Sequence, residues 1–275
     1  MPTRNSYFQL IEDEIQFREN PRSPRITHVK VSDLISEFIN ISSLPFNVKD
    51  YGASGNGLTD DTEAIQAAID AAYLVGGTVF IPIGTFRISP NQLIVKSGIS
   101  IVGEGRGSIL KVIDNPGDYE YIFTSNPRTA NVNNFRLANL TIDQNVAANT
   151  TCNVNVSDAG VMQFVFILWS GTNIVVENVY FDDCCGVNTV VVSGPQVANV
   201  KVHNCHFTFV KARTLNDPDE YDNSTIYLDG DGLDVSYNVF ETTIDDRARG
   251  AIELHGKNAT AIGNVSHNYK CIVRG

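Results

Sequence analysis

The chain has 275 residues, and its 43% hydrophobic content is enough to bury a substantial core. Its formal net charge of −11 disfavours nucleic acid and anionic membranes as partners, because both carry negative charge themselves. No apolar run is long enough to span a bilayer, and residues 1–8 lack the apolar segment of a secretory signal, so we expect no membrane insertion.

Residues 1–44 differ from the rest of the chain in being polar, and we interpret them as an N-terminal extension. Within them, residues 21–25 are predicted to form a linker, because two Pro residues flank Arg and Ser there. Residues 31–39 are predicted to form a short amphipathic helix. The extension either packs on the main body or docks another protein, and the sequence leaves these alternatives open.

A second helix is predicted to begin near Asp60. The Asp60 side chain is placed to cap it, with Glu63 three residues later as the other half of a capping box. The residues that follow form one apolar face, which consists of Ile65, Ala68, Ile69 and Ala72. We expect this helix to cover an open end of the fold, and we interpret Asp60 and Asp61 as structural and not catalytic residues.

From Leu137 onwards a short phrase recurs every 26 to 39 residues: an apolar residue, an Asn two positions later and usually an apolar residue at its end. Tyr237 breaks the pattern in one copy, where Asn238 is the next residue. The copies lie at residues 137–142, 176–181, 202–207, 235–240 and 262–267. A second phrase, rich in apolar residues and closed by Gly, precedes the later copies at 167–171, 190–194, 226–230 and 252–256. Each coil thus reads as strand, Gly bend, strand, Asn turn and return loop.

Repeats of this length and composition indicate stacked coils with a continuous core. We predict an all-β fold for residues 45–275, a parallel β-helix. A β-sandwich is less compatible, because its turns would not preserve a phrase of two strands. Residues 269–275 read as a strand without a cap. We therefore expect either that residues 45–275 are the front part of a longer β-helix, or that another subunit covers this end.

Three motifs lie in the first part of this unit: FNVKDYGASGNG at 46–57, LTDDTEAIQAAI at 58–69 and GGTVFIP at 76–82. Together with residues 84–86 and 101–105, this stretch resembles the first module of the pectate-lyase-like superfamily, especially the tailspike and appendage proteins of bacteriophages. The resemblance implies a right-handed, single-stranded parallel β-helix with an N-terminal capping α-helix. The activity stays open, because this superfamily holds lyases, hydrolases, epimerases and binding proteins.

The resemblance also implies partners and a location. We expect a homotrimer that recognises, and degrades, a bacterial cell-surface glycan or teichoic acid during host adsorption. The location implied is the virion, in a tail or appendage, with extracellular action and with the N-terminal extension docking a virion or tail protein. Two alternatives are kept: a receptor-binding or structural module without catalysis, and a secreted bacterial enzyme that acts on uronans.

The best candidate site lies late in the chain. Aligning the first strands by their closing Gly places Ser170, Ser193, Asp229 and His255 in one outward column, and Leu168, Val191, Tyr227 and Glu253 in the next. Stacked strands lie about 4.8 Å apart, so these side chains would share one patch. We predict catalytic roles for Asp229, Glu253 and His255. Substrate-binding roles are predicted for Tyr227, Asp245, Asp246, Arg247 and Arg249.

Two mechanisms suit this patch. In glycoside hydrolysis, Asp229 and Glu253 would act as a pair of carboxyl groups. In a lyase, Arg247 or Arg249 would neutralise a uronic carboxylate while Tyr227 or His255 transfers protons.

A rival site is the acidic pair Asp143 and Asp182, in a second outward column that continues with Thr208, Glu241 and Asn268. No cofactor and no protein-bound metal site are expected. The Asp-Gly-Asp-Gly run at 229–232 lacks the spacing and the terminal Glu of a calcium loop, although a divalent cation such as calcium is left open. The five cysteines are expected to be structural or incidental thiols.

Overall fold

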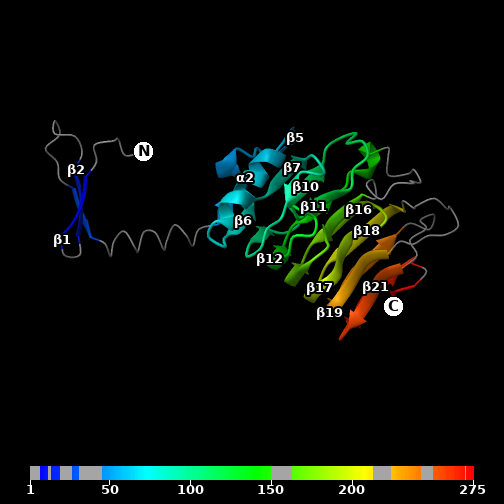
Figure 1. The fold of residues 1–275 in the computed structure, drawn as a ribbon. Helices are drawn as coiled ribbons and strands as arrows, with labels where there is room; N and C mark the ends of the chain where they lie inside the picture. The colour runs from blue at the N-terminus through cyan, green and yellow to red at the C-terminus, as the bar shows by residue number, and fades with distance from the viewer. Residues whose placement is uncertain are drawn as a thin grey trace. The chain divides into compact units, whose positions relative to one another are not determined.

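The computed structural model describes residues 7–11, 14–18, 27–30, 45–149, 163–212, 224–242, 250–269 and 271–275. The chain divides into two compact units, Met1–Pro45 and Phe46–Gly275. In the first unit, β1 (Tyr7–Ile11), β2 (Glu14–Arg18) and β3 (Thr27–Lys30) form an antiparallel sheet in the order β1-β2-β3 (Figure 1).

This N-terminal sheet was not predicted from the sequence, which suggested only a polar extension. The signal was present in β2, whose residues Glu14–Arg18 alternate polar and apolar side chains as half-buried strands do. The predicted linker at 21–25 and the predicted helix at 31–39 lie outside the residues that the structure describes.

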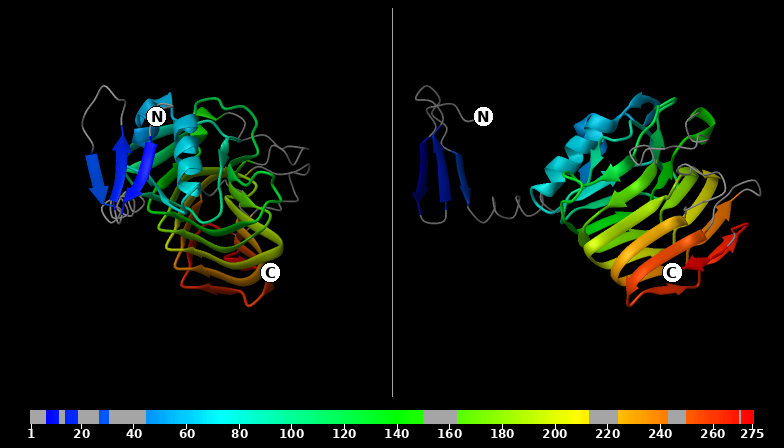
Figure 2. Two further views of the ribbon diagram at one scale, coloured as in Figure 1. Left: turned by 60° about the vertical axis from the view of Figure 1, so that its left-hand side comes forward. Right: turned by 45° about the vertical axis from the view of Figure 1, so that its right-hand side comes forward.

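The second unit is a parallel β-helix, as predicted, in which every strand pair among the described residues is parallel (Figures 1 and 2). Its winding is the right-handed one of parallel crossovers. The coils contribute strands to three faces, although the first coil has no strand in the face that is named face 1. It consists of β8 (Leu93–Ile94), β11 (Tyr121–Thr124), β14 (Phe164–Leu168), the first part of β17 (Val190–His203), the first part of β19 (Ser224–Ser236), β21 (Gly250–Lys257) and β24 (Val273–Arg274).

The other two faces follow along each coil. Face 2 consists of β4 (Phe46–Asn47), β6 (Thr78–Ile81), β9 (Ser100–Gly103), β12 (Val132–Ala138), β15 (Gly171–Glu177), the last parts of β17 and β19, and β22 (Thr260–Ile262). Face 3 consists of β5 (Asn56–Asp60), β7 (Gly84–Ile88), β10 (Ser108–Val112), β13 (Thr141–Asp143), β16 (Tyr180–Gly186), β18 (His206–Ala212), β20 (Val239–Thr242) and β23 (Val265–His267). Short 3₁₀ helices, η1 (Val48–Tyr51) and η2 (Val146–Ala148), lie in connections.

The recurring Asn of the sequence marks the corner between face 2 and face 3. Asn139, Asn178 and Asn204 each adopt a left-handed backbone conformation there, with φ of 57°, 53° and 53°. Asn tolerates this conformation better than most residues, because its short polar side chain bonds locally. Tyr237 takes the same corner with φ 57°, so the coil that breaks the sequence pattern keeps the same turn.

Aromatic rings stack through the core of the coils. The rings of Phe181 and Phe207 lie 4.6 Å apart, and those of Phe207 and Phe240 lie 5.0 Å apart, both nearly parallel. All three side chains are fully buried. Stacked rings fix the register between coils, because a slip by one residue would turn them out of the core.

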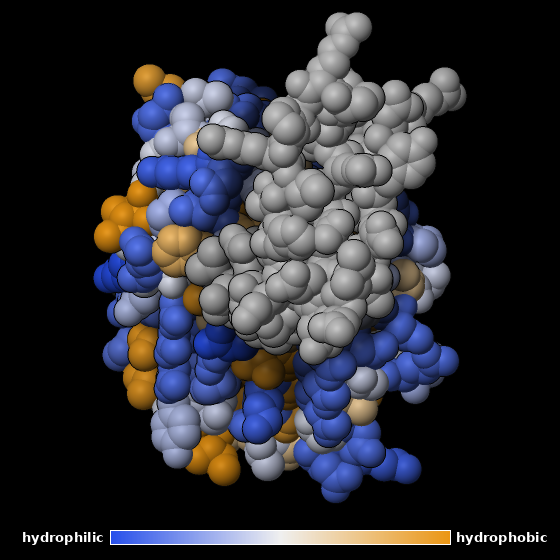
Figure 3. All heavy atoms as spheres, turned by 90° about the vertical axis from the view of Figure 1, so that its left-hand side faces the viewer, coloured by the Kyte–Doolittle hydropathy of each residue, from blue (hydrophilic) through white to orange (hydrophobic). Residues whose placement is uncertain are grey.

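The helix predicted in the first module is present as α2 (Thr62–Tyr73), with Ile65, Ala68, Ile69 and Ala72 on its buried face. It packs against η1, β4, β6, β7 and β8 of the first coils (Figure 2). That α2 closes the end of the stack stays a prediction. The coloured atoms in the view of Figure 3 are mostly hydrophilic, and the hydrophobic side chains among them lie apart from one another.

The predicted capping box of α2 is wrong. Asp61 is the N-cap residue, and its carboxylate accepts hydrogen bonds from the N–H groups of Ser54 and Gly55, at 2.7 and 3.0 Å, and none from α2. Asp60 accepts from the N–H group of Thr62 at 3.0 Å. The acids therefore hold the loop before α2 against the helix start.

One expectation about the cysteines is also wrong, because Cys185 is disulfide-bonded. The neighbouring Cys184 forms no disulfide, and neither do Cys205 and Cys271. Burial raises the pKa of the Cys205 thiol to about 12, so this thiol is inert at neutral pH. Among the described residues, no helix is both long and apolar enough to cross a membrane.

Candidate functional site

The outer surface of face 1 holds four of the predicted site residues. In the register of β19 and β21, Tyr227 lies opposite Glu253, and Asp229 lies opposite His255. Ser193 of β17 precedes Asp229 in the same column. Asp245, Asp246, Arg247 and Arg249, which were predicted to bind substrate, lie outside the residues that the structure describes.

The predicted columns are wrong in one coil. Leu168 pairs with Val192, not with Val191, so the column of Glu253 begins with Ile167. The residue after Leu168, next to Ser193, is therefore Trp169 and not Ser170. The cause is that the corner from Val192 to Ala198 is longer than the corner from Leu168 to Thr172, so that their closing Gly residues are not equivalent.

Glu253 and His255 form a hydrogen-bonded pair at the centre of the patch. The His255 Nε2–H donates to Glu253 Oε1 at 2.9 Å, and Ser224 Oγ donates to Glu253 Oε2 at 3.1 Å. The Glu253 side chain is 8% exposed, whereas the His255 side chain is 42% exposed. The carboxylate is therefore buried with both oxygens bonded, and the imidazole connects it to solvent.

Tyr227 and Asp229 flank this pair on the neighbouring coil. The rings of Tyr227 and His255 lie 5.2 Å apart, at an angle of 36°. Asp229 is half-buried and accepts no hydrogen bond from any residue that the structure describes. One face of the coils thus offers an imidazole, a phenol and an available carboxylate within two adjacent strands.

An apolar floor beside the pair was missed from the sequence. Phe164, Ile167, Val187 and Val191 are buried together on the outer side of face 1, with Tyr121 and Tyr227 packed against them. The signal was the unbroken apolar run of β14, Phe164–Leu168, since a strand that buries both of its faces loses the alternation of polar and apolar residues. The floor lowers the local dielectric, which strengthens the electrostatic interactions of the pair.

The rival pair lies on face 3, where Asp143 of β13 is directly opposite Asp182 of β16. Asp143 is engaged by Lys111 Nζ at 2.5 Å. Burial raises the pKa of Asp182; the Arg106 guanidinium, 3.9 Å away, opposes this, and the Asp143 carboxylate adds to it. Burial and then Asp143 likewise raise the pKa of Asp183.

The later part of the predicted face 3 column needs one correction. Thr208 pairs with Glu241, and Glu241 pairs with His267, not with Asn268. Among the described residues, no group of three or more His, Cys, Asp or Glu side chains is arranged to hold a metal ion.

The family model of Rhamnogalacturonase A/epimerase, pectate lyase-like, matches residues 45–270. The chain belongs to this family. The match spans all but the last five residues of the predicted β-helix, and it confirms the resemblance seen in the motifs of residues 46–105.

Curated relatives match a shorter part. Alginate lyase 7 of Azotobacter vinelandii is 43% identical over 113 residues, which is 37% of this chain and 13% of that protein. The mannuronan C5-epimerase AlgE2 of the same organism is 42% identical over 113 residues, or 37% of this chain and 11% of the epimerase. The preneck appendage protein of Bacillus phage PZA is 34% identical over 119 residues, or 42% of this chain and 13% of the phage protein. The chain thus spans only about an eighth of the length of these relatives.

Solved structures agree on the fold. The tailspike protein of E. coli bacteriophage HK620, in complex with pentasaccharide, covers 95% of this chain with 45% of its own length, at 17% identity and a TM-score of 0.66. PfbA, a surface adhesin of Streptococcus pneumoniae, covers 81% of this chain with 63% of its own length, at 18% identity and a TM-score of 0.51. At these identities the two structures show a shared β-helix and no more.

Proposed function

We propose that this chain is part of a bacteriophage tail appendage that binds a uronate-containing polysaccharide of the bacterial surface and acts on it by proton transfer. The observation that carries the proposal is the hydrogen bond from His255 to the buried carboxylate of Glu253. Asp229 and Tyr227 complete the site on the neighbouring coil.

The state of Glu253 favours proton transfer over hydrolysis. A carboxylate that attacks a sugar carbon, or activates water beside it, needs an exposed oxygen. Both Glu253 oxygens are bonded, to His255 and Ser224, and the side chain is 8% exposed. Glu253 instead fixes the tautomer and the orientation of His255, as a buried carboxylate does for a catalytic imidazole.

His255 then has the geometry of a base. The Nε2 nitrogen is committed to Glu253, so Nδ1 is the nitrogen that accepts a proton from substrate. In a uronate the acidic proton is on C5, beside the carboxylate. When His255 removes it, the C–H electron pair forms the C4=C5 double bond, the C4–O4 bond breaks, and Tyr227 O–H gives its proton to the leaving O4. Because the rings of Tyr227 and His255 are adjacent, the proton on His255 can return to the phenolate.

The substrate carboxylate must be neutralised for C5 to become acidic. Arg247 and Arg249 keep this predicted role, with Asp245 and Asp246 as predicted contacts to sugar hydroxyl groups. Asp229 is proposed to orient the sugar, because its carboxylate is available one coil from His255. Teichoic acid has no C–H bond beside a carboxylate and would be a ligand only.

The phage assignment is supported by relatives. The preneck appendage protein of Bacillus phage PZA is similar over 119 residues, and the HK620 tailspike shares the β-helix. Alginate lyase 7 and the mannuronan epimerase, by their names, act on uronans. In this proposal the chain assembles as a homotrimer on the virion tail, and the unit Met1–Pro45 docks the virion or tail protein.

The test is an incubation with mannuronan and with purified host surface polysaccharide, followed by three readouts. Elimination gives ultraviolet absorbance from the C4=C5 bond, epimerisation gives exchange of H5 with deuterated water without that absorbance, and hydrolysis gives reducing ends alone. His255→Ala is expected to lower turnover by at least about 100-fold.

The matched control is His203→Ala on face 2, because His203 Nε2 also pairs with a carboxylate, Glu177 Oε2, at 3.0 Å. This variant should retain full turnover. Elimination or exchange that persists in His255→Ala would contradict the proposed site.

A second candidate is glycoside hydrolysis at Asp143 and Asp182. The observation that favours it is the raised pKa of Asp182, which lies opposite an Asp143 paired with Lys111. A carboxyl group of raised pKa beside a charged carboxylate is the arrangement of a general acid with its partner. Reducing ends without absorbance, lost in Asp182→Asn and retained in His255→Ala, would establish this candidate instead.

A further inference from the structure

Trp169, the one tryptophan of the chain, lies on the outer side of face 1. It follows Leu168 at the end of β14, next to Ser193 in the column that continues with Asp229 and His255. A Cβ added to Gly194 would lie 2.3 Å from the Trp169 carbonyl oxygen, which shows how closely these two corners stack. At about 4.8 Å per strand, Trp169 is roughly 10 Å from Asp229 and 14 Å from His255 along the coil axis.

Trp169 belongs to neither of the two hydrophobic clusters of the described residues, and it is 37% exposed. Large aromatic side chains at a surface are over-represented at binding hot spots, because they bury much area for little lost conformational freedom. An exposed indole in line with the proposed catalytic residues is therefore placed to contact the same ligand.

Arg128 accompanies the indole. Its guanidinium lies 5.6 Å from the centre of the Trp169 ring, and its NH1 pairs with Glu120. The Arg128 side chain is 42% exposed, and the guanidinium has further N–H donors besides the one that pairs with Glu120. Because the ion pair fixes the guanidinium, little conformational entropy is lost when a ligand binds it.

The loop that carries Arg128 is held in place by its neighbours. Ser125 Oγ donates to the Arg128 carbonyl at 3.0 Å. Ser170 Oγ donates to Asn131 Oδ1, which joins this loop to the residue directly after Trp169. One hydrogen bond within the loop and one between adjacent coils therefore hold the segments that carry Arg128 and Trp169.

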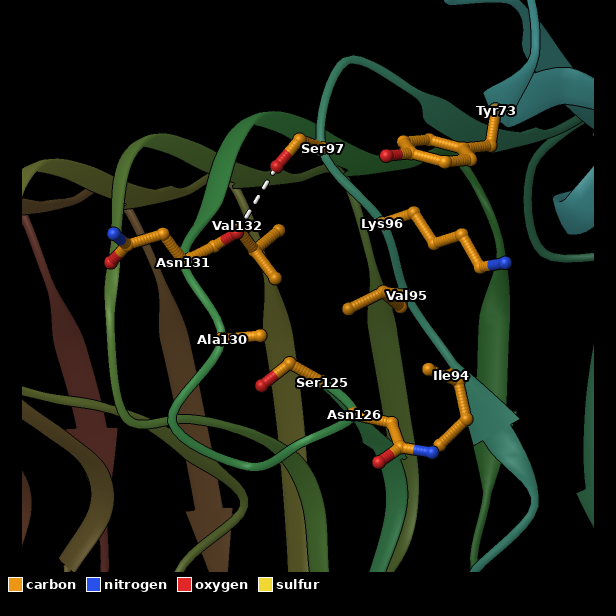
Figure 4. Close-up of a pocket in the computed structure, with 10 residues that line it drawn as sticks. All are labelled: Tyr73, Ile94, Val95, Lys96, Ser97, Ser125, Asn126, Ala130, Asn131 and Val132. Atoms are coloured by element: carbon orange, nitrogen blue, oxygen red, sulfur yellow. Dashed lines mark hydrogen bonds between the residues drawn. The ribbon is translucent and has the colours of Figure 1, made fainter.

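A pocket of about 260 Å³ lies on the other side of this loop, at the corner between face 1 and face 2. Figure 4 shows Tyr73 and Lys96 on one side of it, Asn131 on the opposite side and Asn126 below them. Its volume is below that of pockets for drug-sized ligands and suits a single sugar ring. Lys96 lies 5.2 Å over the Tyr73 ring and pairs with Asp70 at 2.6 Å, so a second cation is fixed at the rim.

We infer that Trp169 and Arg128 form a remote sugar-binding subsite, in which one pyranose ring of an extended anionic glycan stacks on the indole and its carboxylate meets the guanidinium. The Tyr73 pocket receives the adjacent sugar. Apolar C–H groups of a pyranose suit an aromatic face, and the Arg fork suits a carboxylate. The identity of the polymer as a uronan rests on the proposed function.

The subsite has a consequence for chain length. A glycan that runs along the coil axis crosses one strand about every 4.8 Å, so a sugar on Trp169 is about three strands away from the sugar at His255. A trisaccharide bound at His255 does not reach Trp169, whereas a hexasaccharide does. The subsite therefore selects long substrates.

The test uses the full chain and its tryptophan fluorescence, excited selectively, which reports Trp169 alone because no other tryptophan is present. Titration with a mannuronate hexasaccharide is expected to change the emission saturably. Titration with a trisaccharide is expected to leave the emission unchanged. Trp169→Phe and Arg128→Lys are expected to lower kcat/KM for the hexasaccharide about tenfold and to leave the trisaccharide value unchanged.

The control variant is Tyr237→Asn, which removes another exposed aromatic ring at a corner away from face 1 and should change neither value. His255→Ala should abolish turnover and keep the fluorescence change. Turnover of the hexasaccharide without any fluorescence change, and unaltered in Trp169→Phe, would overturn the subsite while the proposed function stands. A fluorescence change without turnover would support the subsite and contradict the proposed function. Neither binding nor turnover would reject both.

Discussion

The His255 Nε2–H donates to Glu253 Oε1 at 2.9 Å, and the two residues are two positions apart on the same strand, β21. Residues i and i+2 of a strand point to the same side, so the pair is set by local sequence. What the neighbouring coil adds is Ser224, whose hydroxyl bonds the second Glu253 oxygen at 3.1 Å. The Glu253 carboxylate thus receives one hydrogen bond from its own strand and the other from the adjacent coil.

Ser224→Ala tests the hydrogen bond from the adjacent coil. The change leaves Glu253 Oε2 buried without its hydroxyl donor, so the carboxylate is held less firmly and His255 is less well oriented. We expect kcat on a uronan to fall roughly tenfold with KM nearly unchanged, the pattern of a group that acts in the transition state. Steady-state kinetics of the two proteins provides the measurement. An unchanged kcat would show that His255 does not depend on the Glu253 contact.

The repeats made most of the fold predictable. Asn139, Asn178 and Asn204 stand at equivalent corners because one backbone conformation recurs there, and a recurring conformation leaves a recurring residue. The columns of face 1 were predicted correctly wherever the corners of adjacent coils have equal length, as for Asp229 and His255.

The errors arose where the sequence does not show how many residues a corner contains. Nothing in the residues around Gly194 indicated that this corner is longer than the one at Gly171, so Trp169 was assigned to no column. The partner of Cys185 was equally out of reach, because disulfide connectivity depends on distances between segments that sequence alone does not give. Ile167, which points outward, was in neither predicted column, since burial of both faces of a strand hides the alternation.

Gly256→Ala is expected to destabilise the β-helix strongly. Gly256 has φ 127°, and an added Cβ would lie 1.8 Å from the carbonyl oxygen of Gly230 on the adjacent coil. The two backbones would have to separate, so we expect a loss of about 3 kcal/mol or more in the free energy of unfolding. The matched control is Gly98→Ala, where φ is 74° and nothing lies within 4 Å of the new Cβ. It should cost only the backbone strain, about 1–2 kcal/mol. Equal losses in urea unfolding would refute the steric account.

Tyr237→Asn is expected to be neutral or stabilising. Tyr237 holds φ 57° at the corner where Asn stands in the other coils, and a bulky residue is strained in this conformation. Asn relieves the strain, whereas loss of the Tyr237 ring, which packs over Gly263, opposes the gain. We expect a net change between zero and about 1 kcal/mol in favour of the folded state. Thermal unfolding measures it, and a clear drop in Tm would show that the ring contact outweighs the strain.

Asp182→Asn is expected to stabilise the chain at neutral pH and not in acid. Burial raises the pKa of Asp182 above its ordinary value of 3.8, with Arg106 opposing and Asp143 adding to the rise. The folded state therefore binds more protons than the unfolded state between the two pKa values, and the free energy of unfolding falls as pH rises through that interval. The penalty persists at pH 7 and is absent below the unfolded pKa. Because the side chain is 34% exposed, solvent screening keeps the gain below about 1 kcal/mol.

Asp143→Asn is the contrasting variant, since it removes the partner of Lys111 at 2.5 Å and should destabilise at pH 7. Urea unfolding at about pH 3 and pH 7 separates the two, and a pH-independent effect of Asp182→Asn would show that its carboxyl titrates as it does in the unfolded chain.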